Sequence, residues 1–134
     1  MRTITKDIDL SIDGEKKTFR LTKLDAFSGV ELLRLLLRLQ DNRPSEKLTV
    51  LDLVTSLSGE ELRSVMTSVF NHTEVLLPAG PHPVMTGTEW GWPELEHDAP
   101  ACLRLLLEGA AWSLSGFFGA GGPTSGSGLP DTSR

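Results

Sequence analysis

Apolar and polar residues alternate along the opening of the chain, from residue 4 to residue 12, with Lys6 as the exception. A period of two is typical of a β-strand with one buried face. An Asp-Gly dipeptide at residues 13–14, which tolerates positive φ, follows, and Phe19 and Leu21 then resume the alternation. The pattern predicts an N-terminal β-hairpin.

The next segment, from Phe27 to Gln40, has helical character, and Asp25 is its expected N-cap. Its charged residues form one stripe at spacings of three and four, namely Glu31, Arg34 and Arg38. The apolar residues cover far more than the ~100° arc that a surface helix needs for its core face; they are Val30, Leu32, Leu33, Leu35, Leu36, Leu37 and Leu39. We expect this helix to be buried on more than one side.

Two further helices are predicted after a linker at residues 41–45. The first is short, and its spaced apolar residues are Leu48, Leu51, Val54 and Leu57. The second begins at a capping box, with Ser58 at the N-cap and Glu61 at N3, and extends to Phe70. A short strand is predicted at residues 73–77.

The stretch from Pro78 to Glu96 is rich in glycine and proline, which excludes any long regular element. Loops longer than ~12 to 15 residues are usually either functional or disordered. Because this stretch contains Val84, Met85, Trp90 and Trp92, we expect an ordered loop that is partly docked on the core and partly available to a partner.

A last helix is predicted from an N-cap at Asp98 to about Phe118, with an i,i+4 pair between Arg104 and Glu108. It is apolar nearly all round. The tail, residues 119–134, consists mainly of Gly, Ser, Pro and Thr and is expected to be disordered. The predicted fold class is therefore α+β: one domain over residues 1–118, with a hairpin, about four helices and a long ordered loop.

Composition and charge argue against some classes of partner. A chain of 134 residues with 39% hydrophobic content can build one modest core. The net charge of -5 and the pI near 5.1 give no general attraction to phosphate backbones, so we expect no nucleic-acid partner. The single cysteine, the polar N-terminus and the lack of a ~20-residue apolar run predict a cytosolic protein without a membrane partner.

The residues that could carry chemistry lack the usual spacings. His72, His82, His97 and Cys102 show neither a CxxC nor an HExxH pattern, so we predict no catalytic residue, no metal site and no cofactor. Cys102 is expected to be a small buried core residue. An enzyme with a site around His82, His97 and Glu94 is the least favoured alternative.

Two apolar clusters are candidate partner-binding sites. Trp90 and Trp92 share a face if their segment is extended, and aromatic residues of this kind anchor many interfaces. Leu114, Phe117 and Phe118 end the last helix, and Leu36 represents the leucine-rich first helix. In the alternative interpretation, these side chains close the core.

Five segments, taken in order, resemble the small tail assembly chaperones of long-tailed bacteriophages and prophages. The segments span residues 1–5, 24–29, 57–62, 76–80 and 112–118, and their sequences are MRTIT, LDAFSG, LSGEEL, LLPAG and WSLSGFF. Each is weak alone, so the resemblance rests on their order over roughly residues 3–118 and on the size of the chain.

The resemblance implies a non-catalytic helper in the host cytoplasm. Such a protein binds the tape measure protein, keeps that long helical chain soluble, recruits major tail tube subunits around it and is absent from the mature virion. The two over-apolar helices agree with this, because a hydrophobic client or self-association would cover them. The alternative is a structural tail or connector component that stays in the virion.

Overall fold

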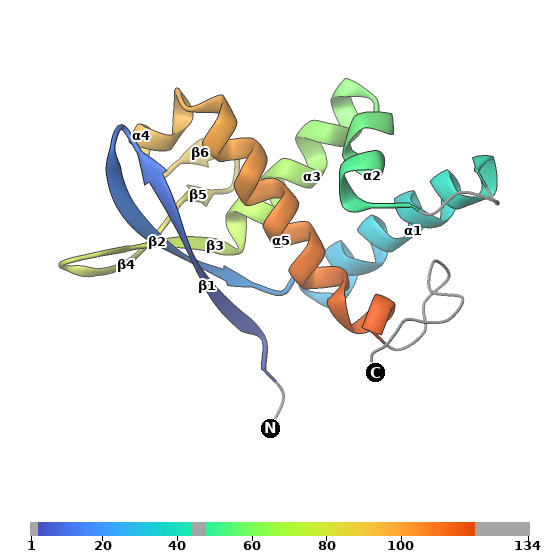
Figure 1. Cartoon of the computed structure of the whole chain (residues 1–134), viewed down its shortest axis with the longest axis horizontal. Helices are drawn as coiled ribbons and strands as arrows, with labels where there is room; N and C mark the ends of the chain where they lie inside the picture. Colours follow the sequence, from blue (N-terminus) through green and yellow to red (C-terminus); the bar gives the residue numbers. More distant parts are fainter. Residues whose placement is uncertain (1–2, 44–47, 120–134) are drawn as a thin grey trace.

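The computed structural model describes residues 3–43 and 48–119, with side chains placed as far as Ser115. Within this part, the long helix α5 runs diagonally between an antiparallel sheet and the other long helices (Figure 1). The buried apolar residues form one hydrophobic core. The α+β prediction is confirmed, whereas the tail from residue 120 onward lies outside the described residues.

The predicted N-terminal hairpin is present. Strand β1 (Thr5–Ile12) pairs antiparallel with β2 (Glu15–Thr22), and Ile12 faces Glu15 across a two-residue turn. Asp13 and Gly14 both have positive φ, 52° and 83°, which is the conformation that a twisted hairpin of this loop length needs.

The hairpin extends into a sheet of four strands in the order β1-β2-β3-β4. Strand β3 (Thr73–Leu77) has the predicted bounds and pairs antiparallel with β2, while β4 (Gly80–Pro83) pairs with β3. The sequence placed β4 in a loop. Its prolines are tolerated because β4 is an edge strand, where a missing N–H interrupts no central ladder.

The two faces of the sheet differ in polarity. Phe19, Leu21 and Val75 are almost fully buried beneath the helices. On the opposite face, Arg20 donates to Asp7 over 3.0 Å, and neighbouring polar side chains are similarly paired. This is the usual arrangement of an antiparallel sheet with one solvated face.

The helices begin where their caps predict. Helices α1 (Ala26–Asn42) and α3 (Gly59–Asn71) start after Asp25 and Ser58, whose side chains accept from backbone N–H groups of the first turn. Helix α2 (Val50–Ser56) starts at a second capping box, of Thr49 and Asp52. Helix α5 (Ala99–Gly119) follows the predicted cap at Asp98, which accepts from the backbone N–H of Ala101.

The predicted long loop is folded. It contains β4, a small hairpin of β5 (Met85–Thr86) and β6 (Glu89–Trp90), and the one-turn helix α4 (Pro93–Glu96). The prediction of an ordered segment without a long regular element is confirmed, because none of these elements exceeds four residues, but the short strands and α4 were not predicted. Gly87, with φ 62°, supplies the turn between β5 and β6.

Helix α5 contacts every other helix and the first two strands, which explains how its apolar surface is covered. Leu105, Leu106, Ala110 and Leu114 on this helix are almost fully buried. Its last turns also fix the start of the chain, since the Trp112 indole N–H donates to the Ile4 carbonyl over 3.1 Å. In the described part of the chain, no helix combines the length and apolarity needed to cross a bilayer.

A close approach of α5 to α3 occurs at Gly109. A Cβ added there would lie 2.5 Å from Cγ1 of Val69, a β-branched side chain that is 2% exposed. Val69 has no free volume into which it can rotate, because interiors are close-packed. The missing side chain at Gly109 therefore sets the distance between the two helices.

Replacement of Gly109 by alanine is expected to lower the free energy of unfolding by about 1–3 kcal/mol, the usual cost of overpacking a core. The better helix propensity of alanine, worth up to ~1 kcal/mol, offsets only part of this. Urea unfolding provides the measurement. Gly59→Ala is the matched control, because nothing lies within 4 Å of the added Cβ at that helical position. Unchanged or higher stability of Gly109→Ala would contradict the close packing.

Candidate protein-binding surfaces

Three of the predicted partner-binding residues lie in the hydrophobic core. Leu36, Leu114 and Trp92 are 1%, 2% and 6% exposed. Their prediction as surface anchors is corrected, because each lies on the inward face of its element and contacts the core from there. Phe117 and Phe118 belong to the last turns of α5, but their side chains lie outside the described residues.

The two tryptophans of the former loop do not share a face. Trp92 lies under the sheet, with its ring edge-on to Phe19 at a centroid distance of 5.8 Å. Trp90 is half-buried and contacts Phe70 of α3, also at 5.8 Å. The chain turns at Gly91, whose absent side chain permits a close approach to Pro83: an added Cβ would lie 2.4 Å from the Pro83 carbonyl oxygen. Of the predicted residues with described side chains, Trp90 alone remains accessible.

Helix α1 carries apolar side chains on its outer surface. Phe27 is 90% exposed, Val30 63% and Leu37 44%. At 100° per residue, Val30 and Leu37 point away from the buried leucines of the same helix, and Phe27 extends this line toward the N-terminus. We call these three residues the α1 stripe. The expectation that this helix is buried on more than one side is therefore wrong, because one face is buried and the other is exposed. The expectation that the fold leaves apolar surface uncovered on both long helices holds for α1, whereas most of the apolar residues of α5 are buried.

A second apolar surface is concave. It is a groove of about 490 Å³ between α3 and the β5–β6 hairpin. We call it the α3 groove; its lining residues are Gly59, Leu62, Arg63, Met66, Thr67, Phe70, Met85, Thr88 and Trp90. Leu62, Met66 and Phe70 face it together because they recur every four residues along α3.

The wall opposite α3 is fixed by Asn71. The Asn71 side-chain amide donates to the Gly87 carbonyl over 2.9 Å, and its oxygen accepts from the Gly87 N–H over 2.8 Å. This pair of hydrogen bonds attaches the tip of the β5–β6 hairpin to the end of α3. The groove is therefore bounded by two anchored elements, although nothing in the local sequence around Asn71 predicts this contact.

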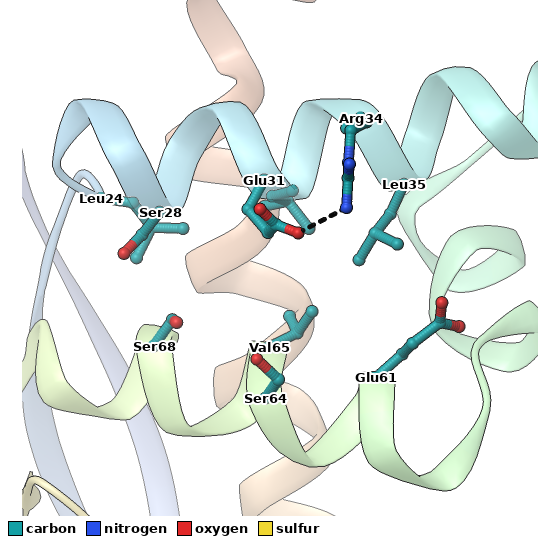
Figure 2. Close-up of a pocket in the computed structure, with 10 residues that line it drawn as sticks. Leu24, Ser28, Glu31, Arg34, Leu35, Glu61, Ser64, Val65 and Ser68 are labelled. Carbon is teal, nitrogen blue, oxygen red and sulfur yellow. Dashed lines mark hydrogen bonds and ion pairs between the residues drawn. The ribbon is translucent and has the colours of Figure 1, made fainter.

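A cleft of about 220 Å³, lined by polar and apolar residues, separates α1 from α3 (Figure 2). Ser28 and Ser68 lie at one end of it and Glu61 at the other. The charged groups of its lining are paired: Arg34 donates to Glu31 over 2.9 Å, and Glu61 accepts from Arg38. These paired charges and three serine hydroxyl groups share the lining with Leu24, Leu32, Leu35 and Val65, so the surface of the cleft is mixed in polarity.

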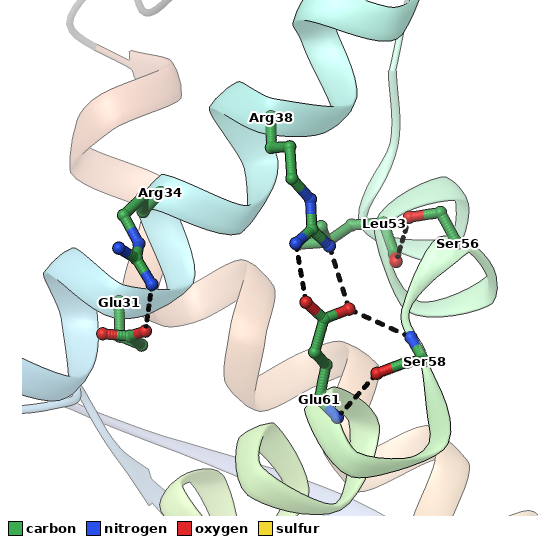
Figure 3. A network of polar contacts seen from close by, with 7 residues as sticks. All are labelled: Glu31, Arg34, Arg38, Leu53, Ser56, Ser58 and Glu61. Atoms are coloured by element: carbon green, nitrogen blue, oxygen red, sulfur yellow. Dashed lines mark hydrogen bonds and ion pairs between the residues drawn. The ribbon is translucent and has the colours of Figure 1, made fainter.

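Glu61 connects three parts of the fold (Figure 3). Its carboxylate accepts two bonds from Arg38 of α1, at 2.6 and 2.9 Å, and one from the Ser58 N–H that caps α3. The hydrogen bond from Arg38 is the main reason that the pKa of Glu61 falls from 4.5 to about 2. An ionised Glu61 therefore favours this contact between α1 and α3.

The side chains considered for chemistry have structural contacts. Cys102 is buried, as predicted, and desolvation raises the pKa of its thiol to about 11, which disfavours a thiolate nucleophile. The His72 ring bonds the Ser68 carbonyl and lies 3.4 Å from Asp25. The His82 ring bonds the Gly91 carbonyl over 2.7 Å. Among the residues described, no three His, Cys, Asp or Glu side chains are grouped to hold a metal ion.

No protein-family model, curated protein or solved structure matches the chain. The functional argument therefore rests on the exposed apolar surfaces.

Truncation of Leu36, in the core, should lower the free energy of unfolding far more than truncation of Phe27, on the surface. Leu36→Ala is expected to lower the free energy of unfolding by about 2–5 kcal/mol, since it removes a 1%-exposed side chain. Phe27→Ala should change it by no more than about 0.5 kcal/mol, because Phe27 makes little contact with the fold. Chemical denaturation of both variants checks this, and similar losses would refute the assignment of Phe27 to the surface.

Stability should fall with acid through Glu61. Because its folded pKa is depressed, this group contributes its stabilisation above about pH 4.5 and loses it as the pH falls toward about 2. In Glu61→Gln, which removes the ionisable group, the midpoint of thermal unfolding should decline less steeply over this range. Parallel pH profiles for the two proteins would argue against the role of the Arg38 contact.

Proposed function

We propose that the chain is an assembly chaperone for the tail of a long-tailed phage. In this role it binds the tape measure protein, keeps it soluble and recruits tail tube subunits around it. It acts in the host cytoplasm and leaves before the virion is complete. The proposal needs no catalytic group or cofactor.

The observation that carries the proposal is the apolar surface left uncovered beside a well-filled core. Phe27 is 90% exposed on a helix whose other side buries four leucines, and the α3 groove is a second uncovered apolar surface, on another helix. Soluble monomers rarely expose apolar surface in clusters unless a partner covers it. An amphipathic helical client, which has its own apolar face, is one partner that can do so.

Charge supports a holding role. The chain has a net charge of -5, which is the sum of +2 over residues 1–47 and -7 over residues 48–134. Net charge far from zero keeps a protein with exposed apolar surface soluble. The exposed apolar surface and the charge support a holding role without naming a client. The resemblance to tail assembly chaperones over residues 3–118 supplies the client, the tape measure protein.

Co-expression with the tape measure gene from the same phage or prophage tests the proposal. The tape measure protein should move into the soluble fraction and co-purify with the chain. A Phe27→Ser/Val30→Ser double variant should retain less of it, because the α1 stripe loses its apolar surface. Lys16→Ser, an exposed substitution on the hairpin, serves as the control.

Failure of the unaltered chain to co-purify with the tape measure protein or to improve its solubility would count against the proposed function. Mass spectrometry of purified virions adds a second check. Stoichiometric presence in finished particles would favour a structural component over a chaperone.

A further inference from the structure

We propose that the α3 groove binds an amphipathic helix of the client that carries a carboxylate beside its apolar stripe, and that this carboxylate pairs with Arg63. The inference rests on the proposed function and specifies the chemistry of the bound segment.

The dimensions of the groove suit a helix. Its α3 wall extends from Gly59 to Phe70, about three turns or roughly 16 Å at 1.5 Å per residue. A partner helix that presents residues i, i+4 and i+7 covers roughly 10 Å, which fits within that length. The volume of about 490 Å³ is roughly three times that of an engineered 150 Å³ cavity that holds one benzene molecule. The groove therefore has room for about three apolar side chains.

The polar groups of the groove define the charge of the partner. Arg63 is the one charged residue among the nine that line it, and its guanidinium has no hydrogen bond or ion pair within the described residues. The indole N–H of Trp90, also in the lining, likewise has no described acceptor. Both groups are donors only. A carboxylate supplies the matching acceptors and charge, whereas a lysine or arginine at that place would meet a like charge.

The apolar surface of the groove is deformable. Met66 and Met85 line opposite walls, and they are the chain's methionines other than Met1. Methionine has three rotatable bonds and a polarisable sulfur, so such surfaces adapt to side chains of different shape. A long helical client offers many successive segments that differ in sequence, and a methionine-lined groove can accommodate more than one of them.

The two methionines also provide the test. The full chain, labelled with [methyl-13C]methionine, is titrated by NMR with overlapping synthetic peptides that tile the tape measure protein. Peptides that carry Asp or Glu beside an apolar i, i+4, i+7 stripe should shift the Met66 and Met85 methyl signals. For these peptides, Arg63→Glu should weaken binding by about tenfold, and Arg63→Lys by much less. A peptide whose acidic residue is changed to arginine should regain affinity for the Arg63→Glu variant.

Lys16→Glu is the matched control, since it makes the same charge reversal on the exposed hairpin, outside the groove. Peptides that bind without shifting Met66 and Met85, or that bind the Arg63→Glu variant as tightly as the unaltered chain, would overturn the inference. In that case co-purification of the tape measure protein would still stand, and the proposed function with it. Absence of binding by any peptide would also overturn the inference, while loss of co-purification by the whole chain would remove the proposed function itself.

Discussion

The structure depends on the enclosure of α5. This helix is apolar nearly all round, and such a helix is stable in water when neighbours cover most of its surface. The sheet covers one side and α1, α2, α3 and α4 contact others, which leaves one exposed strip at Leu103, Arg104 and Ala111. At the crossing with α3, Gly109 allows the backbones to approach until Val69 touches the α5 surface. If this contact opened, the fold would lose part of the packing of the helix that contacts β1, β2 and every other helix.

Helix α1 has a similar composition but a different position. It lies at the side of the molecule, where α5 and α2 contact one face (Figure 1). Leu32, Leu35, Leu36 and Leu39 fill that face and Leu33 packs partly against the core, whereas Phe27, Val30 and Leu37 remain exposed. Helices α1 and α5 look equally apolar in sequence, but their roles differ. Helix α5 lies at the centre of the core, whereas α1 also presents an exposed apolar surface.

The sequence predicted the elements whose signals are local. The Asp13-Gly14 turn, the caps at Asp25 and Ser58 and the bounds of β3 each depend on a few adjacent residues. The pairing of β3 with β2 and the folding of residues 80–90 into short strands depend on contacts between distant parts of the chain, and no local pattern encodes them.

The site was predicted less well for the same reason. Trp90 and Trp92 share a face only if their backbone is extended, and the turn at Gly91 separates them. The exposure of Phe27 and the burial of Leu36 likewise depend on where α1 lies relative to α5, which periodicity alone does not determine. The Asn71 clamp, which fixes one wall of the α3 groove, involves an exposed amide and a turn glycine 16 residues away.

The α1 stripe and the α3 groove lie on opposite sides of one helical layer. The cleft between α1 and α3 is lined by Ser28 and Glu31 from one helix and by Ser64 and Ser68 from the other. At 100° per residue, Val30 and Leu37 lie roughly half a turn from the cleft side of α1, and Leu62 and Met66 lie roughly half a turn from the cleft side of α3.

Because Arg38 and Glu61 hold the helices together across the cleft, the two surfaces keep a fixed relation. One is convex and the other concave, so a single chain can contact two apolar partners at once without competition between them. Under the proposed function, this arrangement would let the chain hold two segments of the tape measure protein at once.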